Sequence, residues 1–340
     1  MAPSAPAPLP LTAVRPLLAV PGARVSIEGG PFPVGQPALP EVRVGSAPAR
    51  VVFARSREIV IQVPVEAPPG RQPLRLDAAP GAAAFLDVAA VVATGIHQVD
   101  NPAVDALGNV YLTCSGSRGQ QSPVSVYRVR PNGLREVFVT GITNATSLAF
   151  GPDGRLYVSS RFDGTVARVD EDGHAEVVAT DLGVACGIAF GPEGELYVGD
   201  RGGAIFVVDL AAGSTRTLAT LPASVAAFHL AVSPAGDLFV TGPTLASHDC
   251  VYRVSRDGRV EVVARGFGRP QGLAFDRAGR LHVVEALAGA CGFYRLDADG
   301  SRELVASAPA LVGAAFDALG GLVLASNDTA WRFAPSSGCS

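Results

Sequence analysis

One short pattern occurs six times along this chain and constrains its fold more than any other feature. Each copy is an apolar stretch, a turn that ends in glycine, and a second apolar stretch, as in residues 187–200. Such a unit predicts a β-hairpin. The turn glycines are 46, 40, 42, 43 and 41 residues apart and are Gly108, Gly154, Gly194, Gly236, Gly279 and Gly320. A period near this length, with strand patterns and no helical ones, predicts a β-propeller with six blades.

Two further apolar stretches follow the hairpins, for example at residues 252–254 and 261–263, so we expect four strands per blade. The last copy stops after its third stretch, near Ala334. An unassigned stretch at residues 88–94 precedes the first hairpin and is similar to the fourth stretch at residues 175–180. We therefore expect residues 88–94 to complete the sixth blade as a clasp, which pairs both open sheet edges. The propeller is predicted to cover residues 88–335, with a tail at residues 336–340.

The first 87 residues do not follow this repeat. Residues 1–10 are rich in Pro and Ala and are expected to form a flexible tail. In residues 11–87, apolar residues alternate with other residues in several short stretches separated by Pro and Gly, which are residues 25–29, 42–45, 59–64 and 73–76. Several short strands in a segment of this length predict a small β-sandwich.

Particular residues of this segment also carry a family resemblance. They are Arg15-Pro16, Gly22, the run Val25-Ser26-Ile27-Glu28-Gly29 with Phe32 after it, Val44-Gly45, and Val63-Pro64 followed by Gly70. In these features residues 11–87 resemble the IPT/TIG family of immunoglobulin-like domains. The resemblance implies an immunoglobulin-like sandwich that acts as a spacer or interaction module. The expected fold is therefore all-β, a small sandwich followed by a six-bladed β-propeller.

The composition argues against several classes of function. All 27 basic residues are Arg, so the chain has no Lys for Schiff-base chemistry or for a P-loop. The net charge of −4 provides no broad basic field for nucleic acid, and no apolar run is long enough to span a membrane. The five Cys are scattered without metal-ligand spacing and are expected to be reduced thiols. We expect a monomer, and a cytoplasmic location because no secretory signal is visible.

The repeat register predicts one functional face, because the first strand of each blade starts, and the second ends, at the same side of a propeller. Eight places before the turn glycines are Asp100, Thr146, Cys186, Phe228, Gln271 and Val312. Six places after them are Cys114, Ser160, Asp200, Gly242, Glu285 and Ser326, and one place further are Ser115, Arg161, Arg201, Pro243, Ala286 and Asn327. From these positions we predict that a small molecule or protein binds a face formed by Asp100, Thr146, Arg161, Cys186, Asp200, Arg201, His229, Gln271, Glu285 and Asn327.

Repeats such as residues 147–158 (SLAFGPDGRLYV) resemble the NHL-repeat and senescence-marker-protein/gluconolactonase group of six-bladed propellers, over about residues 88–335. Lactonases of that group hold one divalent metal. By register, the resemblance implies Asp100 as a ligand of a single cation, Ca²⁺, Mn²⁺ or Zn²⁺. However, Cys186 stands where Asn is expected and Phe228 where Asp is expected, whereas a hard cation needs several oxygen ligands. Asp200 and Glu285 can contribute further oxygens, or they can cap loops.

Two other side chains have both a catalytic and a structural interpretation. His229 begins an inner strand and can act as a general base with Asp200 or Glu285 nearby, or it can be a packed histidine with a hydrogen-bond partner. Cys186 can be a nucleophile near His229 or a small buried apolar residue. The sequence favours the structural interpretation for each, because free Cys is usually buried and no triad is recognisable.

Arg161 and Arg201 occupy equivalent places in neighbouring repeats. Two guanidinium groups on one rim can clamp a carboxylate or a phosphate. Alternatively, each forms an ion pair with an acidic residue close in the sequence, Asp163 or Asp200.

Two functions of different classes follow from these observations. The first is a non-catalytic propeller that binds a small molecule or a protein, with the IPT/TIG segment as a spacer or second contact. The alternative is a gluconolactonase-like, metal-dependent hydrolase with a degenerate or rearranged metal site, for which the catalytic candidates are Asp100, His229 and Glu285. The sequence leaves open whether the protein is an enzyme.

Overall fold

The computed structural model describes residues 11–32, 34, 39–77, 84–287 and 289–334. The tails predicted at residues 1–10 and 336–340 lie outside these ranges. All the regular secondary structure within these ranges is β-strand. No helix in the described residues is long and apolar enough to cross a membrane. The chain forms two compact units: Met1–Ala90 with Leu304–Pro309, and Val91–Glu303 with Ala310–Ser340.

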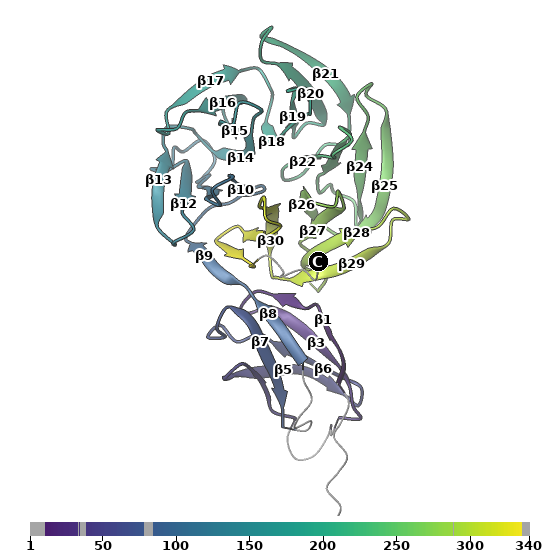
Figure 1. Ribbon diagram of the computed structural model, residues 1–340. Helices are drawn as coiled ribbons and strands as arrows, with labels where there is room; N and C mark the ends of the chain where they lie inside the picture. Colours follow the sequence, from purple (N-terminus) through teal and green to yellow (C-terminus); the bar gives the residue numbers. More distant parts are fainter. Residues whose placement is uncertain (1–10, 33, 35–38, 78–83, 288, 335–340) are drawn as a thin grey trace, which may run out of the picture. The chain divides into compact units, whose positions relative to one another are not determined.

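The second unit is a β-propeller, in which four-stranded sheets form a ring with the first strand of each sheet nearest the centre (Figure 1). Within each sheet, neighbouring strands follow one another in the sequence, as expected for consecutive hairpins. Four such sheets are β10 (Ala103–Val104), β11 (Val110–Thr113), β12 (Val126–Val129), β13 (Arg135–Val139); β14 (Ala145–Phe150), β15 (Leu156–Ser160), β16 (Thr165–Val169), β17 (Ala175–Ala179); β18 (Ala185–Phe190), β19 (Leu196–Asp200), β20 (Ala204–Asp209), β21 (Ser214–Thr220); and β22 (His229–Val232), β23 (Leu238–Thr241), β24 (Asp249–Val254), β25 (Val260–Phe267).

A fifth separate sheet contains the predicted clasp. Its order is β30 (Leu311–Phe316), β31 (Leu322–Ser326), β32 (Thr329–Arg332) and β9 (Ala90–Thr94). The segment that precedes all the hairpins is thus hydrogen-bonded beside the last strand of the chain, as the sequence predicts. The clasp begins at Ala90 rather than at residue 88, because Val88 belongs to the preceding strand.

Strands β26 (Pro270–Phe275), β27 (Leu281–Glu285), β28 (Gly292–Leu296) and β29 (Arg302–Ser307) are neighbours in the same order as the strands of these sheets. They do not form a separate four-stranded sheet, because β29 extends into residues of the first unit, where Ala306 and Ser307 pair with Leu18 and Ala19. The described residues therefore contain five separate four-stranded sheets of the propeller.

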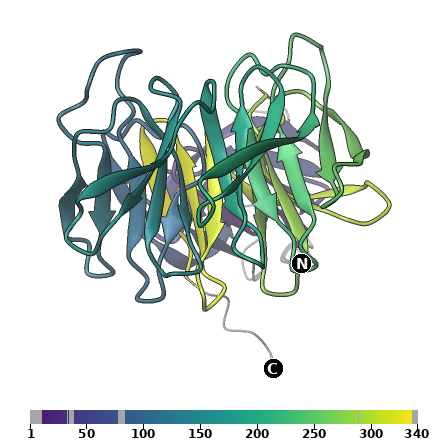
Figure 2. The same ribbon diagram turned by 90° about the horizontal axis from the view of Figure 1, so that it is seen from above.

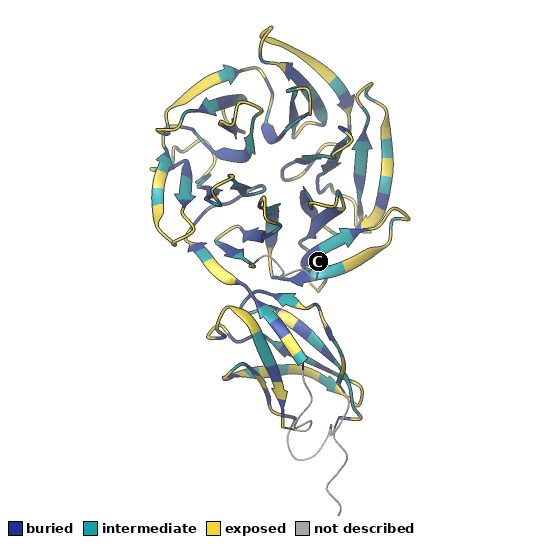
Figure 3. Ribbon diagram, viewed as in Figure 1, coloured by how far each residue is buried: buried dark blue, intermediate teal, exposed yellow. Residues whose placement is uncertain are grey.

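The outermost strand of each sheet is more exposed than the strands nearer the centre of the ring (Figure 3). In β18 all residues but the last are buried, whereas Val177 of the outer strand β17 is 56% exposed. Apolar side chains fill the space between neighbouring sheets, as where the rings of Tyr157 and Phe190 meet edge to face at 4.7 Å. Short connections join the strands at the two faces of the ring (Figure 2). A rigid ring of this kind holds the strand ends, and the side chains on them, in fixed positions.

The first unit contains β1 (Leu11–Arg15), β2 (Leu18–Ala19), β3 (Arg24–Gly29), β4 (Val42–Val44), β5 (Ala47–Arg55), β6 (Glu58–Gln62), β7 (Gly70–Leu76) and β8 (Ala84–Val88). The four strands expected from the alternation are present as β3, β4, β6 and β7. Their alternate apolar residues are buried, among them Ile27, Ile59 and Leu74, so one face of each strand supplies the core of this unit. The immunoglobulin-like arrangement and the IPT/TIG assignment stay predictions.

Candidate functional site

The pairing of the first two strands confirms which residues share one end of each sheet. Ala185 at the start of β18 pairs with Asp200 at the end of β19, and His229 at the start of β22 pairs with Thr241 at the end of β23. The same relation holds for Pro270 and Glu285. The face that the repeat register predicts is therefore formed by the strand ends.

A buried polar network connects β22 and β26 with Asp100, which precedes β10. His229 Nδ1 lies 2.5 Å from Asp100 Oδ1, and His229 Nε2 lies 2.8 Å from Gln271 Oε1. The exposed fractions of Asp100, His229 and Gln271 are 1%, 0% and 6%. Because three residues far apart in the sequence meet here, the network lies where the inner strands converge.

Neighbouring groups hold this network in place. Gln98 Nε2 donates to the Asp100 carbonyl oxygen at 2.9 Å, and Thr241 Oγ1 donates to the Gln271 carbonyl oxygen at 2.5 Å. A Cβ atom at Gly313 would lie 2.5 Å from the Asp100 carbonyl oxygen, so only glycine allows β30 to approach the segment before β10 this closely. The position of Asp100 is thus set by backbone packing as well as by its own bonds.

His229 has no ring nitrogen available as a base. With the Gln271 oxygen facing Nε2, both ring nitrogens donate and an imidazolium pairs with the Asp100 carboxylate. With the Gln271 amide rotated, Nε2 accepts a hydrogen bond and the ring is neutral. In either form both nitrogens are hydrogen-bonded, which corresponds to the packed-histidine interpretation. The partner of His229 is Asp100 and not Asp200 or Glu285, the residues expected from the sequence.

Asp200 and Glu285 cap loops. Asp200 Oδ1 accepts a hydrogen bond from Val184 N at 2.8 Å. The Glu285 carboxylate accepts from Gly268 N and Arg269 N, both at 2.8 Å, and from Leu287 N at 3.0 Å. These bonds fix the loops at this face and use carboxylate oxygens that a metal or a substrate would need.

Cys186 and Phe228 are both buried at this face. Burial raises the pKa of the Cys186 thiol to about 11, and the negative charge of Asp100 adds to the shift. A thiol in this state is neutral near pH 7 and is a poor nucleophile. Phe228 fills the space left by two glycines, since a Cβ at Gly199 or Gly242 would lie within 3 Å of its side chain. Cys186 is the second residue of β18 and Phe228 directly precedes β22, and neither supplies an oxygen ligand.

The residues at the starts of the inner strands do not fit the divalent cation that the gluconolactonase resemblance implies. The carboxylate of Asp100 is hydrogen-bonded to His229, the Cys186 position offers a neutral thiol, and the Phe228 position offers a phenyl ring. Ca²⁺ takes six or more oxygen ligands, and Zn²⁺ takes about four nitrogen, sulfur or oxygen ligands. This donor set is therefore short of ligands for both ions.

Arg161 and Arg201 follow β15 and β19 at equivalent places, as the register predicts. Neither forms an ion pair with any described residue, so the expected pairs with Asp163 and Asp200 are not formed. Asp163 contacts the hydroxyl of Ser160 instead, with 2.9 Å between Asp163 Oδ2 and Ser160 Oγ. Two cationic groups at this face are therefore not neutralised by the acidic residues close to them in the sequence.

The charges near Arg161 are mostly positive. Burial lowers the pKa of Arg161, and the charges of Arg201 and Arg118 lower it further, with Cys186 acting in the opposite direction. Burial and the charge of Arg161 also lower the pKa of His97. Cys186 is close enough to Asp100, Arg161 and Arg201 for each to affect its pKa. The arginines and the buried network therefore belong to one site.

Arg118 was not itself predicted as a site residue, although its long loop, residues 115–123, is expected from the sequence to overhang this face. The loop is held by Asn144, whose Oδ1 accepts from Gly119 N at 2.7 Å and whose Nδ2 donates to the carbonyl oxygens of Ser115 and Ser117 at 2.5 and 2.9 Å. Ser115 is fully buried, and its Oγ has no hydrogen-bond partner among the described residues. The length of the loop was the only sequence signal, because irregular loops have no repeat register.

The remaining predicted residues have structural contacts. Thr146 Oγ1 donates to the Asn144 carbonyl oxygen at 2.7 Å, next to the loop of Arg118. Asn327 is exposed, and its Nδ2 donates to the Gln98 carbonyl oxygen at 3.0 Å. Both side chains therefore hold backbone segments beside the site through these hydrogen bonds.

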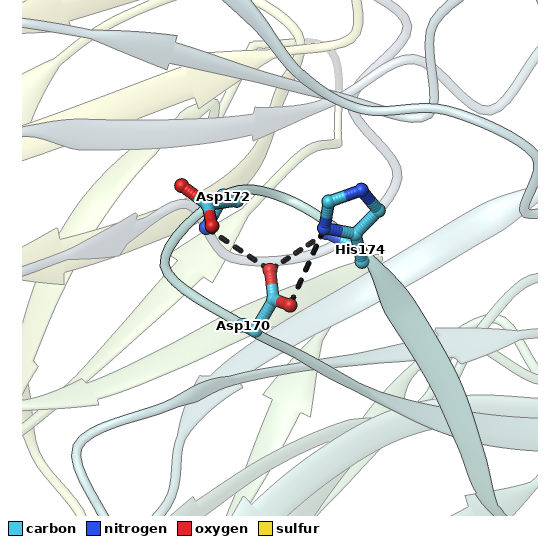
Figure 4. A group of neighbouring side chains, drawn as sticks. All are labelled: Asp170, Asp172 and His174. Atoms are coloured by element: carbon cyan, nitrogen blue, oxygen red, sulfur yellow. Dashed lines mark hydrogen bonds and ion pairs between the residues drawn. The ribbon is translucent and has the colours of Figure 1, made fainter.

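Two other places on the propeller do not carry a site. Asp170, Asp172 and His174 gather on the turn between β16 and β17, but Asp170 Oδ1 accepts hydrogen bonds from the backbone of the other two, so the turn itself explains the cluster (Figure 4). A hollow of about 720 Å³ lies beside turn residues such as Gly194, at the opposite ends of the strands. Its acidic side chains are engaged, as in the ion pair of Glu193 with Arg256.

Comparisons with known proteins support the fold. No protein-family profile and no curated protein sequence matches this chain. An auxiliary nutrient binding protein from Bacteroides ovatus is similar over 98% of this chain and 99% of its own, with 16% identity and a TM-score of 0.56. A protein described as a candidate gluconolactonase is similar over 73% of this chain and 92% of its own, with 17% identity and a TM-score of 0.58. A catalytically inactive virginiamycin B lyase from Staphylococcus aureus with quinupristin is similar over 77% and 90%, with 14% identity and a TM-score of 0.52. At these identities the likeness establishes the propeller fold and no activity.

Proposed function

We propose that this protein is a non-catalytic binding protein, and that its propeller binds a small molecule at the face formed by the strand ends. One observation carries the proposal. The carboxylates of Asp100, Asp200 and Glu285 are engaged in internal hydrogen bonds, whereas Arg161 and Arg201 form no ion pair with any described residue. A site whose carboxylates are already hydrogen-bonded, but whose guanidinium groups are available, is suited to binding a ligand.

The likeness to an auxiliary nutrient binding protein is compatible with this role, since that protein shares the fold over nearly the full length of both chains. The alternative, a gluconolactonase-like hydrolase, is supported by the likeness to the candidate gluconolactonase. It requires a metal, and the residues around Asp100 do not provide the ligands. We therefore prefer binding to hydrolysis.

A thermal-shift screen against neutral, cationic and anionic small molecules tests the proposal. Ala286 has the place in its repeat that Arg161 and Arg201 have in theirs, so Ala286→Trp adds bulk at the same face without changing charge. We expect some compounds to raise the Tm of the wild type and to lose this effect with Ala286→Trp. A screen in which no compound raises the Tm contradicts the proposal.

The competing function needs its own assay. We expect no hydrolysis of sugar or aliphatic lactones with Ca²⁺, Mn²⁺ or Zn²⁺ present. Metal-dependent turnover that disappears in both Asp100→Asn and Asp100→Ala, with the circular dichroism spectrum unchanged, would establish the hydrolase instead.

Two assignments of architecture belong to the same proposal. We count β26, β27, β28 and β29 as the sixth blade, because their order repeats that of the separate sheets. We also propose that residues 11–87 form an IPT/TIG-like sandwich that serves as a spacer or second contact, on the strength of the residues given above. A fragment covering residues 88–335 that binds the same compounds would assign the binding site to the propeller alone.

A further inference from the structure

We propose that the ligand of this face carries a carboxylate or phosphate group, which Arg161 and Arg201 bind together and Arg118 approaches from its loop. This inference rests on the proposed function and names the chemical class of the ligand.

The fold brings the two guanidinium groups to one place. Arg161 and Arg201 each follow the second strand of a sheet directly, and the two sheets are consecutive in the ring. Ser115 occupies the equivalent place in the preceding sheet. Two consecutive sheets thus present guanidinium groups from equivalent positions at the same face.

The charges of these arginines are not compensated within the described residues. Asp163 is hydrogen-bonded to Ser160, and Asp200 to the backbone of Val184. Arg161 is half-buried and forms no hydrogen bond or ion pair with any described residue, although a partly desolvated guanidinium normally has an acceptor. An anion of the ligand would supply the acceptor and would relieve the repulsion between the arginines.

The geometry of Arg201 and of the Arg118 loop suits this role. Arg201 Nε donates to the Ser224 carbonyl oxygen at 3.3 Å, which orients the guanidinium while both terminal nitrogens stay available to a ligand. Carboxylate and phosphate groups accept paired hydrogen bonds from such a fork. Asn144 holds the loop that carries Arg118, with 2.7 Å between Gly119 N and Asn144 Oδ1. Arg118 is therefore held near Arg161 by a buried side chain.

Ser115, in the loop that carries Arg118, adds an observation that is independent of charge. Ser115 Oγ is fully buried and has no hydrogen-bond partner among the described residues. A buried hydroxyl is seldom left without a hydrogen-bond partner, and such groups usually meet a ligand or a water molecule. A small organic acid or phosphate fits this face better than a polyanion does, because the chain as a whole has a net charge of −4.

The test is isothermal titration calorimetry on the full chain at low ionic strength. The probes are inorganic phosphate, citrate and succinate, with succinamide as an uncharged counterpart of succinate. The variants are Arg161→Gln, Arg201→Gln and the double variant. Arg277→Gln is the matched control, because Arg277 is exposed in the turn between β26 and β27, at the opposite ends of the strands, and has no ion pair among the described residues.

We expect at least one anionic probe to bind the wild type, and each single variant to weaken its binding about tenfold, as for the loss of one charge-assisted hydrogen bond. Arg277→Gln should bind as the wild type does, and succinamide should not bind. A preference for phosphate over the carboxylates would indicate a phosphorylated ligand, and the reverse preference a carboxylic acid.

Two results would overturn the inference. One is an anionic probe that binds the double variant as tightly as the wild type. The other is a wild type that binds no anionic probe but binds uncharged compounds in a manner that Ala286→Trp blocks. The second result leaves the proposed function intact, whereas a protein that binds no compound at all contradicts the proposed function as well.

Discussion

Replacing His229 by Ala should destabilise the protein strongly, because it leaves the Asp100 carboxylate buried without its partner. Both side chains are almost completely inaccessible, and 2.5 Å separates His229 Nδ1 from Asp100 Oδ1. Breaking a buried pair of this kind by removing one partner costs about 3–5 kcal/mol. For a domain of this size each kcal/mol lowers the Tm by about 2–4 °C, so we expect a loss of about 6–20 °C.

A double-mutant cycle separates this effect from lost packing. In Asp100→Ala/His229→Ala no buried charge remains, so the double variant should be more stable than the sum of the two single losses predicts, by about 2 kcal/mol or more. Chemical unfolding monitored by circular dichroism and by Trp331 fluorescence measures all four proteins.

The chain offers a matched control for the size of the cavity. His282 is also buried, but it stacks on Phe293, with 5.0 Å between ring centroids, and its Nδ1 lies 3.0 Å from the Arg280 carbonyl oxygen. His282→Ala therefore removes a buried ring without stranding a carboxylate. If His229→Ala costs no more than His282→Ala, and the cycle is additive within about 0.5 kcal/mol, the reasoning about the buried pair is wrong.

Three further predictions follow from the described contacts. Burial lowers the pKa of His282 below 6.5, so as the pH falls this histidine is protonated in the unfolded chain before it is protonated in the folded protein. The Tm should therefore decrease as the pH drops below about 6.5, and His282→Phe should reduce this decrease. With a pKa of about 11, only about one Cys186 thiol in a thousand is ionised at pH 8, so mass spectrometry after iodoacetamide treatment should find Cys186 alkylated only in denaturant. Asn144→Ala removes the hydrogen bonds that hold residues 115–119, so limited proteolysis should cut this loop faster than in the wild type, whereas equal rates would show that other contacts hold it.

Much of the fold could be predicted because the repeat fixes it locally. A turn whose last residue has a positive φ strongly favours glycine at that position. Each of the six turn glycines has a positive φ, such as +90° at Gly194. The clasp could be predicted because residues 88–94 have the pattern of a fourth strand that the last repeat lacks. The precise start at Ala90 could not, since an apolar stretch continues from β8 into β9 without a turn signal.

The candidate site could be predicted only in part. The register of a repeat gives the position of a residue along its strand, and therefore the face of the propeller on which it lies. It thus assigned Asp100, Cys186 and His229 to one face. It does not say which side chains meet across the ring, and so the pairing of His229 with Asp100 was missed. Arg118 was missed because it lies in an irregular loop, where the repeat assigns no position.

The pairing of β9 with β32 has a consequence for the order in which the protein folds during synthesis. Residues 90–94 leave the ribosome before any hairpin of the propeller, whereas their partner, Thr329–Arg332, leaves after all of these hairpins. Strand β9 therefore stays unpaired until the rest of the propeller has been synthesised, and during that time its edge can pair with other chains. We expect ring closure to be the final step, so that a chain stopped before Thr329 would keep the earlier sheets but present two open strand edges.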